Sequence, residues 1–165
     1  METAFELEPS GFMQVKHMTG RKYDVSPSVP TDRTWRGIIV NAPSKVIVHN
    51  EKNTTATRLD IPIPFTSYYC LARPEINLVG RRSTLVIRNE QTQKEWRGTT
   101  TTTDGDRHFY PPAVIDANST AAMSAYMNYN ITNYISLPVE NATYLFWIEV
   151  GTLKSNSCRI QVLIQ

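Results

Sequence analysis

The sequence predicts an all-β protein, an antiparallel β-sandwich with at most one or two short helical turns. Three observations lead to this prediction. The end of the chain alternates apolar and polar residues with the period of two that a strand imposes. Ten prolines are scattered from Pro9 to Pro138, and helix interiors tolerate proline poorly. About ten short strand-like runs are separated by turn residues, a pattern typical of a sandwich or barrel.

Most of the expected strands precede the end of the chain. They lie, in order, at residues 13–17, 35–40, 45–49, 58–63, 67–71, 76–79, 83–88, 96–102 and 125–131. The runs 45–49 and 83–88 are each followed directly by Asn-Glu. This favours a hairpin turn after each run, because Asn tolerates the left-handed backbone region. Helical turns are expected only at 119–123 or 132–137, where Pro138 would end the second.

The last two strands are the clearest. In residues 144–150 one side is formed by Tyr144, Phe146, Ile148 and Val150, and the other by Leu145, Trp147 and Glu149. In residues 158–164 the apolar side is formed by Cys158, Ile160, Val162 and Ile164, and it alternates with Arg159 and Gln161. Residues 151–157 connect the two runs. The pattern predicts a closing hairpin of half-buried antiparallel strands.

The segment Ala142-Thr143-Tyr144, the hairpin that follows it and Ser155-Asn156-Ser157 resemble the final strands of immunoglobulin-like bacterial β-sandwich modules. The resemblance covers roughly residues 70–165. It implies that Tyr144 ties the preceding corner with its hydroxyl, and that residues 83–88 form an earlier core strand. Residues 1–64 are expected to add strands whose placement is open, within a single domain of residues 1–165. Function does not follow from such a fold.

Bulk properties limit the classes of protein. A chain of 165 residues and 18.8 kDa suits one domain, which buries roughly 70% of its unfolded surface. The net charge of +2 is too small to predict a nucleic-acid partner. Residues 1–13 lack the pattern of a signal peptide, and no run reaches the ~18 apolar residues of a membrane span. We therefore expect a soluble protein of unknown location.

Neither the cysteines nor the glycosylation sequons identify the cellular compartment of the protein. Cys70 and Cys158 lie in strand-like runs, and two free core thiols are the preferred interpretation over one disulfide. Four glycosylation sequons begin at Asn53, Asn118, Asn130 and Asn141. A chain rich in Asn, Thr and Ser also forms such triplets by chance, and that interpretation is preferred.

The usual signatures of catalysis are missing from the sequence. His17, His49 and His108 show no metal-ligand spacing, and no glycine-rich phosphate loop or nucleophile motif occurs. Asp104 and Asp106 could offer oxygen ligands to calcium, but the acidic residue that would end a calcium loop is missing, so a plain turn is preferred. We predict a non-catalytic protein without a cofactor.

One candidate binding region follows the expected strand 96–102. It combines aromatic area with cationic donors, the composition favoured at protein-binding hot spots, in Trp96, Arg97, Arg107, His108 and Tyr110. The alternative is a long loop whose aromatic residues only close one end of the sandwich.

The second candidate is the uncharged stretch 126–134. Read as a strand, it places Tyr126, Asn128 and Asn130 on one face, and Met127, Tyr129 and Ile131 on the other. A Tyr/Asn face suits protein or sugar contacts, or pairing with another subunit because no Lys or Pro protects it as an edge. The alternative, equally favoured, is a strand whose polar face meets the N-terminal segment of the same chain.

These observations lead to one main hypothesis and two others. The main one is a β-sandwich that binds a protein partner or associates with itself in an assembly. The first alternative is a carbohydrate-binding module in which Trp96, Tyr110 and Tyr126 stack on sugar rings. A hydrolase ranks third, because it would need Asp104, Asp106 and His108 to line one cleft.

Overall fold

The computed structural model describes residues 27, 30–32, 34–48, 59, 63–72, 83–100 and 122–165. Within these ranges the chain forms strands and one short 3₁₀ turn, so the predicted all-β class is confirmed. The elements are β1 (Gly37–Asn41), β2 (Lys45–Val48), β3 (Pro64–Ala72), β4 (Thr84–Asn89), β5 (Glu95–Thr99), β6 (Ala122–Asn130), η1 (Ile131–Asn133), β7 (Ala142–Val150), β8 (Leu153–Lys154) and β9 (Cys158–Ile164).

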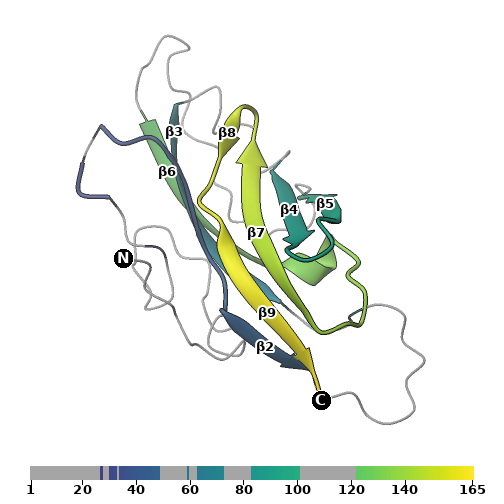
Figure 1. The fold of residues 1–165 in the computed structure, drawn as a ribbon. Coiled ribbons are helices and arrows are strands. Elements are labelled where there is room, and N and C mark those ends of the chain that lie inside the picture. Colours follow the sequence, from purple (N-terminus) through teal and green to yellow (C-terminus); the bar gives the residue numbers. More distant parts are fainter. Residues whose placement is uncertain are drawn as a thin grey trace.

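The described strands form two sheets. One has the order β1-β3-β6; the other has the order β2-β9-β7-β4-β5, with β8 paired to β7. The predicted closing hairpin is confirmed, since β9 runs antiparallel to β7 with Ala142 opposite Val162 and Phe146 opposite Cys158. In Figure 1 the long strands of both sheets run along a similar diagonal, as in aligned sandwich packing.

One described strand pair departs from the predicted antiparallel arrangement. β2 runs parallel to β9, with Lys45 opposite Gln161 and Val48 opposite Ile164. The chain leaves the three-stranded sheet after β1 and passes through the buried Pro43 before it joins the six-stranded sheet as β2. The N–H of Gln161 donates to the carbonyl of Ser44 at 2.8 Å and fixes this entry. The six-stranded sheet is therefore mixed.

The core lies between the two sheets. The rings of Phe65 on β3 and Phe146 on β7 meet with their centroids 5.0 Å apart. Tyr144, Phe146 and Ile148 are fully buried, as are Ile160 and Val162 on β9. The alternation predicted for both final strands is thus confirmed, and burial of their apolar sides is the main stabilising term of the sandwich.

The other expected elements differ from the structure chiefly at their ends. β3 begins at Pro64 and not at residue 67, and β6 begins at Ala122 and not at residue 125. The helical turn expected at 132–137 is the shorter η1, which starts one residue earlier. No helix forms at the described end of 119–123, because Ala122 and Met123 belong to β6.

Three expected strands fall wholly or mostly outside the described residues. The ranges 13–17 and 76–79 are not described, and of 58–63 only Leu59 and Ile63 are, both buried and neither in a strand. The two cysteines are confirmed as free thiols. Cys70 lies on β3 and Cys158 on β9, in different sheets.

Candidate functional site

The candidate residues Trp96 and Arg97 are neighbours on β5 and therefore point to opposite faces of the six-stranded sheet. Trp96 points inward: its ring meets that of Tyr144 edge-on, with centroids 6.1 Å apart, and packs against the core. Arg97 points outward and is exposed. The aromatic ring and the guanidinium therefore do not form one contact surface.

On the outer face, Arg97 binds two carboxylates. Its Nε lies 2.8 Å from Oε1 of Glu95 on the same strand, and its Nη1 lies 2.8 Å from Oε2 of Glu149 on β7. The other carboxylate oxygen of Glu149 accepts a 2.8 Å hydrogen bond from the indole Nε1 of Trp147. That bond, and next the bonds from Arg97, lower the pKa of Glu149.

The ring of Trp147 is contacted by two cations on this face. It is only 3% exposed, although it lies on the side of β7 that faces away from the core. The Nζ atom of Lys154 lies 4.0 Å from the centre of its ring, and Cζ of Arg88 lies 5.4 Å from it. Both distances are within the range of cation–π attraction.

The strand register explains this arrangement. Arg88 on β4 lies opposite Leu145, two residues before Trp147, and Lys154 on β8 lies opposite Glu149, two residues after it. The two cations thus approach Trp147 from opposite directions along β7. We call the outward group on β4, β5, β7 and β8 the Trp147 cluster, which consists of Arg88, Arg97, Trp147, Glu149 and Lys154.

The second candidate region, on β6, lies on the outer face of the three-stranded sheet. Met127 and Ile131 point into the core and Tyr126 points outward, so the predicted division of faces is confirmed. The Tyr126 ring lies 5.0 Å from that of Tyr68 on β3, which in turn stacks at 6.3 Å on Trp35. Tyr126 is 9% exposed and Tyr68 is 7% exposed, and burial raises the pKa of both hydroxyls.

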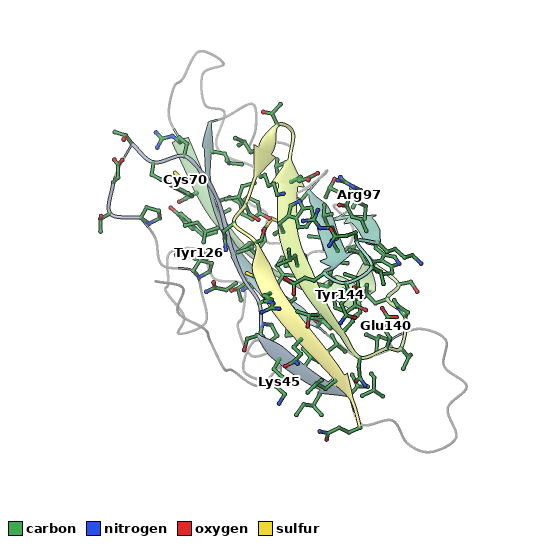
Figure 2. All side chains as sticks on the ribbon, viewed as in Figure 1. Lys45, Cys70, Arg97, Tyr126, Glu140 and Tyr144 are labelled. Atoms are coloured by element: carbon green, nitrogen blue, oxygen red, sulfur yellow. The ribbon has the colours of Figure 1, made fainter. Side chains whose placement is uncertain are left out.

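The structure does not bring the two candidate regions together. Arg97 and Tyr126 lie on opposite sides of the sandwich, as Figure 2 shows. Asn128 and Asn130, which follow Tyr126 on β6, are partly exposed. The candidates Arg107, His108 and Tyr110 lie outside the described residues, as do Asp104 and Asp106.

Sequence reasoning missed Arg88, Trp147 and Lys154 as site residues. A signal was present: the alternation of the final strands placed Trp147 beside Glu149 on the polar side of its strand. A tryptophan on the polar side needs a partner above it, because a large exposed ring is unfavourable in water. The identity of that partner depends on strand register.

The resemblance to immunoglobulin-like modules implied a corner role for Tyr144. Its hydroxyl donates to Oε1 of Glu140, four residues earlier, at 3.1 Å, and the side chain of Asn89 donates to the same oxygen at 3.1 Å. Figure 2 shows Tyr144 and Glu140 at the same end of the sandwich. Burial first, and then the Glu140 carboxylate, raise the pKa of Tyr144. This contact ties the chain before β7 to the end of β4.

Together these features define an all-β protein of two packed sheets with an ionic and aromatic outer face. Comparisons with models of known protein families, with curated proteins and with solved structures found no match. In the described part of the chain, no three His, Cys, Asp or Glu residues are grouped closely enough to hold a metal ion. The same residues include no helix of the length and hydropathy needed to span a membrane.

Proposed function

We propose that this protein is a non-catalytic β-sandwich that acts by protein–protein binding, either to a partner or to further copies of itself. The contact surface is the outer face of the six-stranded sheet around the Trp147 cluster. The observation that supports it is the contact of Arg88 and Lys154 with the ring of Trp147 on one sheet face. Arg is among the residue types most enriched at the energetic centres of protein interfaces, and the buried Trp147 ring supports the Arg88 guanidinium from below.

The strand order supports an immunoglobulin-like assignment. Immunoglobulin-like sandwiches place strands A, B and E in one sheet and C, F and G in the other, and variable-type domains add C′ beside C. The sheet β1-β3-β6 corresponds to A, B and E, and β5-β4-β7-β9 corresponds to C′, C, F and G. On this assignment the core extends before residue 70, because β1 and β3 both belong to it.

The alternative is carbohydrate binding by aromatic stacking. A sugar ring needs the exposed face of an aromatic ring. Trp147, Tyr68 and Tyr126 are each at most 9% exposed, and Trp96 packs against the core. Among the described residues, these burials argue against sugar stacking, whereas a protein partner would contact the Arg88 and Lys154 side chains beside the buried Trp147 ring and not the ring face itself.

The test is the solution mass of the full chain by size exclusion with light scattering over a range of concentrations. Self-association predicts a multiple of 18.8 kDa. Leu145→Glu, on the outer face of β7, should return the mass to that of a monomer, whereas Thr152→Glu in the exposed β7–β8 turn should not. Equal effects of the two variants would exclude this face as the contact between copies. A monomer at every concentration would restrict the proposal to a different partner protein.

A further inference from the structure

The carboxylates around the Trp147 cluster already have partners. Oε2 of Glu90 lies 2.8 Å from Nε of Arg159, and Glu95 binds Arg97 at the same distance. Glu149 is bonded through both oxygens, one to Arg97 and one to Trp147. Each of these three carboxylates is therefore bonded to an arginine or an indole, and Lys154 acts on Glu149 only through a weaker charge interaction that also lowers its pKa.

Two cations on this face have no such partner. Among the described residues, no carboxylate lies within 4.0 Å of Arg88 or Lys154, and each contacts the Trp147 ring. The Nε of Arg88 is buried and has no hydrogen-bond partner. A charged donor buried in this way is costly, and a carboxylate that binds the guanidinium offsets part of that cost.

Geometry favours one type of ligand. Arg88 and Lys154 both contact the ring of Trp147, which restrains both long side chains before any partner arrives. Restrained cations lose less conformational entropy on binding, and guanidinium and ammonium groups both form charge-assisted bonds to carboxylates. A nucleic acid would need more cations than these two to neutralise its phosphates.

We propose that Arg88 and Lys154 form a docking site for an acidic segment of a protein partner. The carboxylates of that segment bind the guanidinium and ammonium groups beside the Trp147 ring. This inference rests on the proposed function, since it names the chemistry of the partner for the same face. It predicts that Arg97 and Arg159, whose charges are already paired, contribute little to recognition.

The experiment uses the isotope-labelled full chain and a hexaglutamate peptide with blocked ends. Nuclear magnetic resonance follows the indole N–H of Trp147 and the Nε–H of Arg88 as peptide is added. We expect saturable shifts at both groups. The double variant Arg88→Gln with Lys154→Gln should weaken binding about tenfold or more, through loss of two charge-assisted contacts. Arg159→Gln, the matched control on the same face, should change the affinity less than about twofold.

Further controls separate folding from binding. Arg88→Lys keeps the charge and should retain most of the affinity, and every variant must keep the wild-type pattern of core resonances. A hexalysine peptide should produce no shift. An oligothymidylate that shifts the same two groups at lower concentration would overturn the inference in favour of phosphate recognition. So would an equal loss of affinity in Arg159→Gln, because the effect would then be general electrostatics.

A second probe separates this inference from the proposed function. A displayed library of random peptides is selected for binding to the immobilised protein, and the selected peptides are then tested by nuclear magnetic resonance. Those that shift the Trp147 indole resonance should be enriched in Asp and Glu. Enrichment of neutral peptides that shift the indole and are blocked by Leu145→Glu would overturn the acidic docking site and leave protein binding by this face intact. If no peptide and no second copy perturbs the face, both proposals fail.

Discussion

Asn156 binds both backbone polar groups of Val40. The N–H of Val40 donates to Oδ1 of Asn156 at 2.8 Å, and Nδ2 of Asn156 donates back to the Val40 carbonyl at 2.9 Å. The Cys158 thiol also donates to that carbonyl, at 3.1 Å. Val40 belongs to the three-stranded sheet, and Asn156 precedes β9 in the other sheet. The amide therefore links the two sheets and occupies the edge of β1, where an unpaired strand would invite aggregation.

We expect Asn156→Ala to lower the free energy of unfolding by about 1–3 kcal/mol, because the N–H of the fully buried Val40 loses its acceptor. Urea denaturation measures this change, and hydrogen exchange at the Val40 amide should accelerate. Asn133→Ala, at an exposed position in η1, is the matched control and should change stability by less than about 0.5 kcal/mol. Equal losses in the two variants would refute the linking role.

Tyr144→Phe should cost about 1–2 kcal/mol of stability, since it removes a hydroxyl that donates to Glu140 and leaves the buried side chain otherwise unchanged. A double-mutant cycle with Glu140→Gln isolates the contact. The cycle should give a coupling energy well above its error; additive losses would mean that hydroxyl and carboxylate do not interact.

Gly98→Ala should destabilise the sandwich by about 1–3 kcal/mol or more through overpacking. A Cβ built at Gly98 would lie 2.5 Å from the backbone oxygen of Tyr134 and 2.8 Å from Cγ1 of Ile135. Backbone cannot move aside as a flexible side chain would. Thermal unfolding measures the loss, with Thr99→Ala at the exposed neighbouring position as the control. If Gly98→Ala were as stable as that control, the contact between β5 and Tyr134 would have room for a methyl group, and the overpacking argument would be wrong.

Glu149 should make the sandwich sensitive to acid. Its pKa is lowered in the folded state by the Trp147 indole bond and then by Arg97, so its contribution is present above its ordinary value of 4.5 and is lost as the pH falls through the lower folded value. Urea denaturation at a series of pH values below about 5 should therefore show a shallower decline in Glu149→Gln than in the wild type. Identical slopes would contradict the assignment. Carboxyl resonances should also show that the pKa of Glu149 rises in Trp147→Phe, which lacks the indole donor.

The candidate site was only partly predictable from the sequence. Arg97 was identified from composition, but Trp96 was expected to share its surface and instead packs inward, because neighbours on a strand face opposite sides. Trp147 was placed on the correct side of its strand by alternation alone. Its contact with Arg88 could not be predicted, because it requires the register between β4 and β7.

The sequence by itself determined the local properties of this protein: the all-β class, the closing hairpin and the side chains of β7 and β9 that face the core. These depend on a period of two within each strand and on turn residues beside it. Only the tertiary structure decided how the strands outside that hairpin pair, including the parallel contact of β2 with β9, and which charges meet around Trp147. Strand pairing joins segments that are distant along the chain, and the selection of partner and register depends on the packing of the whole core.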